Sequence, residues 1–89
     1  MTKYRCLCCG YLTLSGQPED GGTYEICPVC FWEDDGVQSK DPDFRGGANK
    51  GSLNEAREIF LQIGAVEERL KQFTRPPTVE ERAGGPEFA

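Results

Sequence analysis

Residues 6–10 (CLCCG) and 27–30 (CPVC) are the two stretches that decide the fold of this chain. Each contains a C-x-x-C unit, and 17 residues separate the two units, which falls within the spacing expected for a four-cysteine zinc site. Two thiolates in such a unit can converge at a tight turn, and two turns can surround one metal ion with four sulfur atoms. The sequence therefore predicts a metal site made by Cys6, Cys9, Cys27 and Cys30.

The residues next to these cysteines fit tight turns. Gly10 follows the second cysteine of the first unit, where a positive φ is often needed and glycine adopts it at no steric cost. Pro28 fixes φ in the second unit, whereas Phe31 stands where a second glycine is expected. Cys8 is the fifth cysteine, and we interpret it as a packing residue, with a reactive thiol as the alternative.

A metal held by four protein sulfurs has no open position for water or substrate, so the predicted site is structural. The chain has no histidine, and its carboxylates show no pattern of a general acid–base pair. We therefore expect a protein that is not an enzyme. Zinc is the expected metal, and iron is the alternative because ligand softness does not separate the two.

Length and composition limit the classes of function. The chain has 89 residues, enough for one domain whose small core needs additional stabilisation. It carries a net charge of −5, which disfavours nucleic acid and anionic membranes as partners and favours a basic protein. It shows neither a signal peptide nor a stretch that could span a membrane, so we expect a cytoplasmic protein whose paired cysteines bind metal.

Local patterns predict a small α+β domain. Residues 11–14 and 23–26 have the composition of short strands, and the Gly-, Pro- and Asp-rich residues 15–22 predict a turn that joins them into a hairpin. Residues 33–51 are acidic and rich in turn signals. We interpret them as a loop, either ordered and held by the ring of Phe44 or disordered.

One or two helices are expected after this loop. Ser52 and Glu55 form a capping box, apolar residues then recur at helical spacing, and Gly64 suits the end of the helix. A second short helix is predicted over residues 66–73, and residues 78–81 can cap a last turn. Residues 1–75 form the predicted domain, and residues 76–89 are expected to be a partly disordered extension.

Four segments together resemble the bacterial cysteine-rich CPCC domain family: CLCCGYLTL, TYEICPVCFWEDDGVQ, DPDFRGGAN and SLNEARE. The resemblance covers about residues 4–75, with Leu7 in the place of the proline that gives the family its name. It implies a zinc-ribbon or rubredoxin-like hairpin with two zinc knuckles, followed by helices. It also implies the same four cysteine ligands, and it supplies no established activity.

The resemblance to small acidic bacterial proteins suggests an adaptor, or an immunity protein that neutralises a basic toxin. An aromatic anchor surrounded by carboxylates would suit a basic partner, and the candidate residues are Trp32, Glu33, Asp34, Asp35, Asp41 and Asp43. The alternative interpretation places Trp32 in the core beside a solvated turn. Our leading hypothesis is a metal-stabilised protein-interaction module, and a one-iron electron carrier is the second.

Overall fold

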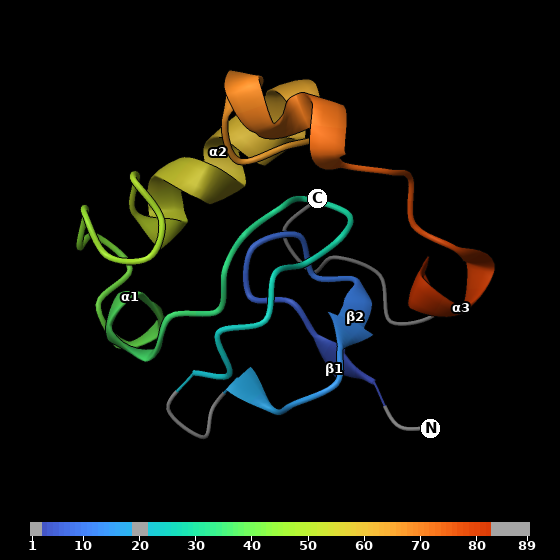
Figure 1. Ribbon diagram of the computed structural model, residues 1–89, viewed down its shortest axis with the longest axis horizontal. Coiled ribbons are helices and arrows are strands. Elements are labelled where there is room, and N and C mark those ends of the chain that lie inside the picture. Colours follow the sequence, from blue (N-terminus) through green and yellow to red (C-terminus); the bar gives the residue numbers. More distant parts are fainter. Residues whose placement is uncertain (1–2, 19–21, 83–89) are drawn as a thin grey trace.

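The computed structural model describes residues 3–18 and 22–82. Helices α2 and η2 lie at one end of the molecule, the two cysteine turns lie below them, and the short hairpin is at the opposite end (Figure 1). Within the described ranges, no helix has the length and apolar character needed to cross a membrane. The elements in chain order are β1 (Tyr4–Arg5), β2 (Leu12–Leu14), α1 (Gly36–Lys40), α2 (Leu53–Ile63), the 3-10 helix η2 (Glu68–Phe73) and α3 (Val79–Arg82).

The predicted pairing of residues 11–14 with residues 23–26 is wrong. Strand β2 pairs antiparallel with β1, and Tyr4 lies opposite Leu14. Around the second cysteine turn, Ile26 instead forms an antiparallel bridge with Glu33. Each C-x-x-C unit therefore stands at the tip of its own small hairpin. Closing a hairpin over a few residues costs less chain entropy than closing one over a long turn, which favours this arrangement.

The segment between the second cysteine turn and α2 is ordered and contains a short helix. Asp35 caps α1, because its Oδ1 accepts hydrogen bonds from the backbone N–H groups of Val37 (2.8 Å) and Gln38 (3.4 Å). The expected anchor, the ring of Phe44, is 42% exposed. The segment is held by other side chains.

Gln38 is the side chain that organises residues 41–51, the loop between α1 and α2. It is fully buried, and its Nε2 lies 3.1, 3.2 and 3.0 Å from the carbonyl oxygens of Phe44, Asn49 and Gly51. Its Oε1 accepts hydrogen bonds from the backbone N–H (3.1 Å) and the side-chain amide (3.0 Å) of Asn49. One amide group thus satisfies backbone groups that would otherwise be buried without partners.

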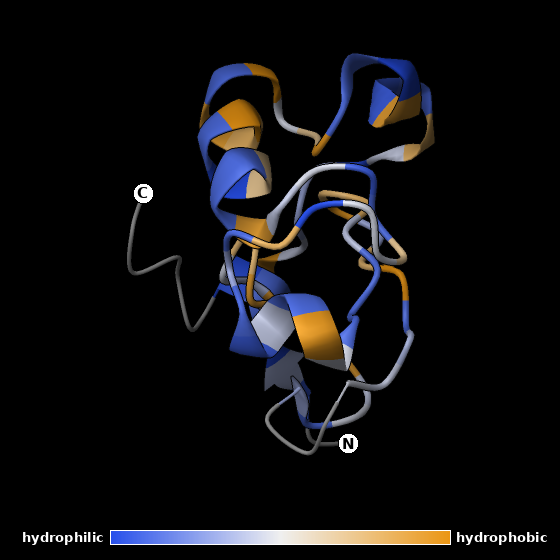
Figure 2. Ribbon diagram, turned by 90° about the vertical axis from the view of Figure 1, so that its left-hand side faces the viewer, coloured by the Kyte–Doolittle hydropathy of each residue, from blue (hydrophilic) through white to orange (hydrophobic). Residues whose placement is uncertain are grey.

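The prediction for α2 is confirmed. The Ser52 hydroxyl accepts from the Glu55 backbone N–H, the Glu55 carboxylate accepts from the Ser52 backbone N–H, and Gly64 ends the helix at φ 79°. Apolar and polar residues alternate along α2 as in an amphipathic helix (Figure 2). The second predicted helix is η2, and the predicted last turn is α3, whose start is capped by Thr78 and Glu81.

All five cysteines belong to the centre of the hydrophobic core. The largest buried side chains around them are Trp32, Leu14 and Leu53. Helix α3 contacts β2, so the extension predicted for residues 76–89 packs against the domain as far as Arg82. The rest of the predicted disordered tail, residues 83–89, lies outside the described residues.

Candidate metal centre

The first cysteine turn is closed by backbone hydrogen bonds at the tip of the β1–β2 hairpin. The N–H of Cys6 donates to the carbonyl of Tyr11 (2.9 Å), and the N–H of Gly10 donates back to the carbonyl of Cys6 (2.9 Å). Gly10 has φ 81°, the left-handed conformation that the sequence predicted for it. This geometry turns the side chains of Cys6 and Cys9 toward the interior, where both are fully buried.

The second turn repeats the first with a different residue at its end. The N–H of Cys27 donates to the carbonyl of Trp32 (2.9 Å), and the N–H of Phe31 donates to the carbonyl of Cys27 (2.8 Å). Phe31 occupies the position of Gly10 and has φ 71°, a conformation that costs a residue with a Cβ roughly 1–2 kcal/mol. Its ring lies 5.5 Å from the ring of Phe73 in η2.

The two turns bring the four predicted ligands together. The sulfur atoms of the four cysteines all lie within 4.8 Å of one another. These cysteines are Cys6, Cys9, Cys27 and Cys30. The distances Cys6 Sγ to Cys30 Sγ and Cys9 Sγ to Cys27 Sγ are both 3.7 Å. A tetrahedral site with metal–sulfur bonds of about 2.3 Å has sulfur–sulfur edges of about 3.8 Å. None of the cysteines forms a disulfide, so the cluster fits a metal ion.

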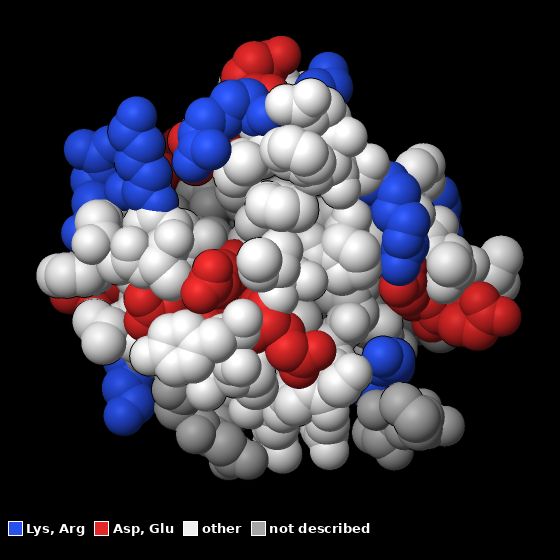
Figure 3. Space-filling view, in the orientation of Figure 1, with Lys and Arg blue, Asp and Glu red and all other residues white. Residues whose placement is uncertain are grey.

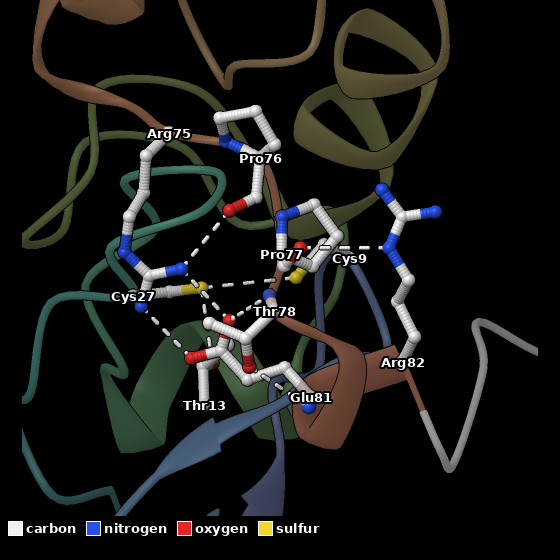
Figure 4. A network of polar contacts seen from close by, with 9 residues as sticks. All are labelled: Cys9, Thr13, Cys27, Arg75, Pro76, Pro77, Thr78, Glu81 and Arg82. Atoms are coloured by element: carbon white, nitrogen blue, oxygen red, sulfur yellow. Dashed lines mark hydrogen bonds and ion pairs between the residues drawn. The ribbon is translucent and has the colours of Figure 1, made fainter.

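Two further groups lie within hydrogen-bonding distance of the sulfurs. The Thr13 hydroxyl lies 3.0 Å from Cys27 Sγ, and the backbone N–H of Trp32 donates to Cys30 Sγ at 3.5 Å. Figure 4 shows Thr13 beside Cys27, with Arg75 and Glu81 on the same side. Donors of this kind stabilise the negative charge of metal-bound thiolates. Sequence reasoning missed Thr13, because only the pairing of β2 with β1 places it there.

The four thiols influence one another strongly. Hydrogen bonds from the neighbouring thiols, above all from Cys30, lower the pKa of Cys27. Donating to Cys27 raises the pKa of Cys6 and Cys9, and burial raises the pKa of Cys30. The charge of one thiolate therefore disfavours ionisation of its neighbours in the buried cluster. A divalent metal supplies the positive charge that allows all four to ionise.

A salt bridge lies close to the sulfur cluster. The guanidinium of Arg75 contacts both carboxylate oxygens of Glu81 at 2.8 Å (Figure 4). This contact lowers the pKa of Glu81 to about 2 and raises the pKa of Arg75, to which the negative charge of Cys27 also contributes. The backbone N–H of Arg75 donates to the carbonyl of Pro28 (3.2 Å), which ties this segment to the second cysteine turn.

The structure does not bring the six candidate partner residues to one surface. Trp32 and Asp34 are each 1% exposed and Asp35 is 6% exposed, so these three cannot form the predicted anchor and its carboxylates. Asp34 Oδ2 accepts from the backbone N–H and the hydroxyl of Thr23, and Asp35 works as a helix cap. Of the six, Glu33 is half-buried, and Asp41 and Asp43 are exposed.

Cys8 is fully buried and lies in the core next to the cluster. This environment is the one expected for a packing residue, since reactive cysteines are usually accessible. Cys8 is not one of the four cysteines whose sulfurs lie close together.

Fold and site together define a small α+β protein with a four-cysteine candidate metal centre. The family model described as cysteine-rich CPCC matches residues 4–81, which is most of the 89-residue chain. The chain therefore belongs to the cysteine-rich CPCC family, as the four sequence segments indicated. No curated protein matches it.

Proposed function

We propose that this protein binds one zinc ion through Cys6, Cys9, Cys27 and Cys30 and uses it as a structural support for a protein-interaction surface, without enzymatic activity. The observation that carries the proposal is the complete burial of the four cysteines, whose sulfurs all lie within 4.8 Å of one another, with two of the distances at 3.7 Å. Four protein ligands leave the ion no position for a substrate. The function then resides on the surface that the ion supports.

The proposed surface lies over the second cysteine turn. Ile26 and Phe73 are exposed, the latter by 58%, and the ring of Phe31 connects them because it packs on Phe73 and lines a groove with Ile26. We call Ile26, Phe31 and Phe73 the apolar patch. Figure 3 shows uncharged side chains in the middle of the face turned toward the viewer, with acidic side chains among them.

The charges next to this patch favour a basic partner in the cytoplasm. Glu33 lines the same groove together with Lys50 and the ion-paired Glu67 and Arg69, and Glu33 forms no ion pair with any residue in the described ranges. A partner that places an apolar side chain on the patch and a lysine or arginine against Glu33 would satisfy both features. In this proposal Phe73, which is exposed, and Phe31, which is half-buried, take the place of Trp32 as the aromatic anchor.

Metal analysis of the purified protein tests the first half of the proposal. We expect one zinc per chain and no colour. Red protein that bleaches on reduction would show an iron centre and would favour the electron carrier. A zinc content far below one per chain, in protein that remains folded, would overturn the structural role.

Partner capture tests the second half. We expect the immobilised zinc-loaded chain to retain a basic protein, and Glu33→Lys or Phe73→Ala to weaken retention while the zinc content stays the same. Glu58→Lys and Leu61→Ala, both on exposed positions of α2, are the matched controls. Equal retention by all four variants would remove the apolar patch from the proposal, and recovery of a basic toxin would make this an immunity protein.

A further inference from the structure

A cavity of about 200 Å³ lies between the loop of residues 41–51 and helix α2. Arg45, Asn49 and Lys50 contribute to it from the loop, and Ala56 and Ile59 from the helix. Trp32 from the second cysteine turn and Val66 after α2 complete its apolar walls. The cavity contains none of the four clustered cysteines and none of the three residues of the apolar patch, but it shares Asn49, Lys50 and Glu67 with the groove beside that patch.

The loop that covers this cavity is held in one conformation by buried polar groups. Gln38 binds the loop from beneath through the carbonyls of Phe44, Asn49 and Gly51. Asp35 Oδ2 accepts from the backbone N–H of Ala48 (2.9 Å). A binding site that is formed before the ligand arrives loses less entropy on binding, so this loop has the properties of a preorganised wall.

Trp32 supplies a hydrogen-bond donor that the protein leaves without an acceptor. Its side chain is almost fully buried, and its Nε1 has no hydrogen-bond partner among the described residues. A buried indole N–H normally finds a partner, and leaving one unsatisfied costs about 1–3 kcal/mol. A ligand that brings an oxygen acceptor into the neighbouring cavity would remove this cost.

One basic side chain at the cavity has no ion-pair partner among the described residues. Arg45 forms an ion pair with Glu55 (2.8 Å), and Glu67, which also lines the cavity, pairs with Arg69 (3.2 Å). Lys50 forms no ion pair within the part of the chain that the structure describes. Basic side chains gather over this loop in Figure 3. Glu55 and Glu67 are both in ion pairs. The charged group at the cavity that has no ion-pair partner among the described residues is therefore the ammonium group of Lys50.

We propose that this cavity binds an apolar group that carries a carboxylate. The apolar part packs on Ala56, Ile59 and Val66, and the carboxylate pairs with Lys50 and offers oxygen acceptors toward Trp32. The ligand is either a free short-chain acid or the carboxy-terminal residue of a polypeptide with an apolar side chain. The site adjoins the groove proposed for the basic partner and shares Lys50 with it, but the two ligands depend on different charges, so Lys50→Met and Glu33→Lys distinguish failure of one proposal from failure of the other.

The single tryptophan makes the test direct. The chain contains one Trp, so the zinc-loaded full-length protein gives one indole N–H resonance, which belongs to Trp32. We titrate it with N-acetyl-L-leucine for the polypeptide terminus, with octanoate for the free acid, and with N-acetyl-L-leucinamide, which lacks the carboxylate. We expect a saturable shift with at least one acid and about fivefold weaker binding of the amide.

The outcomes separate the sources and can overturn the proposal. Preference for N-acetyl-L-leucine indicates a polypeptide terminus, and preference for octanoate indicates a free acid. Equal binding of the leucine acid and its amide would refute the role of Lys50. No saturable shift of the indole resonance with either acid would refute the site.

Two pairs of variants locate the binding. Ile59→Phe fills the cavity and should abolish the shift, whereas Leu61→Phe, on an exposed position of the same helix, should leave it unchanged. Lys50→Met should weaken binding of the acids about fivefold, and Lys40→Met, on α1 away from the cavity, should not. Unchanged amide spectra outside the cavity show that each variant folds, and binding by Ile59→Phe equal to that of the unaltered chain would refute the location.

Discussion

Replacing Gln38 by glutamate tests whether one buried amide fixes the loop of residues 41–51. The substitution keeps the shape of the side chain and exchanges the Nε2 donor for an oxygen. That nitrogen lies 3.1, 3.2 and 3.0 Å from the carbonyls of Phe44, Asn49 and Gly51. In the variant, a carboxylate oxygen faces three backbone carbonyls in a fully buried position.

The expected loss of stability follows from the two amide protons that disappear. Leaving a buried acceptor without its donor costs about 1–3 kcal/mol, so two lost hydrogen bonds cost about 2–6 kcal/mol. The upper part of this range is limited by opening of the loop, which lets water reach the carbonyls. Natural domains are stable by about 5–15 kcal/mol in total, so Gln38→Glu should be severely destabilising although it changes only one atom type.

Urea unfolding of the zinc-loaded protein at pH 7.5, followed by Trp32 fluorescence, measures this loss. Gln62→Glu on the exposed side of α2 is the matched control and should change the free energy of unfolding by less than about 0.5 kcal/mol. Hydrogen exchange at Ala48 and Asn49 should also become faster in the Gln38 variant. A loss below about 0.5 kcal/mol with unchanged exchange would refute the role assigned to this amide.

Three other predictions concern the metal centre and the helix and loop caps. Cys27→Ser should weaken zinc binding and at the same time abolish the far-ultraviolet circular dichroism of the folded chain. The reason is that zinc binding is worth about 10–16 kcal/mol in small zinc peptides. A variant that is folded and metal-free would contradict this. Zinc binding requires four thiolates, so zinc affinity should rise with pH and binding should release protons. A competition titration across pH 6–8 that showed no slope would be incompatible with four thiolate ligands. Asp35→Asn should cost about 1–3 kcal/mol by thermal unfolding, because both carboxylate oxygens accept from backbone N–H groups and an amide can accept on one side only. Asp34→Asn should cost less than about 1 kcal/mol, because one oxygen accepts both bonds from Thr23 and the other faces only the Ser39 hydroxyl at 3.4 Å, which can accept from an amide. The reverse order would refute the assigned roles.

The features that the sequence predicts well are those that depend on neighbouring residues. The C-x-x-C spacing needs only a tight turn, and the left-handed φ of Gly10 follows from that turn. The capping box of Ser52 and Glu55 lies within one helical turn, so the start of α2 follows from four residues. Such local rules apply whatever the rest of the fold does.

The features that the sequence misses depend on residues far apart in the chain. Asp34 and Asp35 belong to an acidic run that resembles a solvated turn, yet each is satisfied by backbone N–H groups of Thr23 and Ala48. The strand pairing was mispredicted because β1 has only two residues, Tyr4 and Arg5, which form no strand pattern in the sequence. Gln38 gives no signal in a single sequence, because any loop glutamine looks the same until the three carbonyls around it are known.

The contrast between Gly10 and Phe31 shows what the second cysteine turn does beyond holding metal. Glycine would suit φ 71° at Phe31 without strain, whereas phenylalanine is strained there and its ring packs on Phe73 of η2. The same turn accepts a hydrogen bond from the N–H of Val66 to the carbonyl of Cys30 (3.0 Å). The second turn is therefore the point at which the metal centre positions the segment after α2.

The first turn is connected to α2 in a comparable way, since Arg57 Nε donates to the carbonyl of Leu7 (2.9 Å). Each cysteine turn thus holds a different helical segment, and the metal ion is the element that would hold the two turns to each other. Loss of the ion would weaken the contact between the two turns, and with it the positions of α2 and η2 that form the cavity and the apolar patch. Both proposed binding surfaces should therefore exist only in the metal-loaded protein, so binding of either ligand should raise the apparent affinity for zinc.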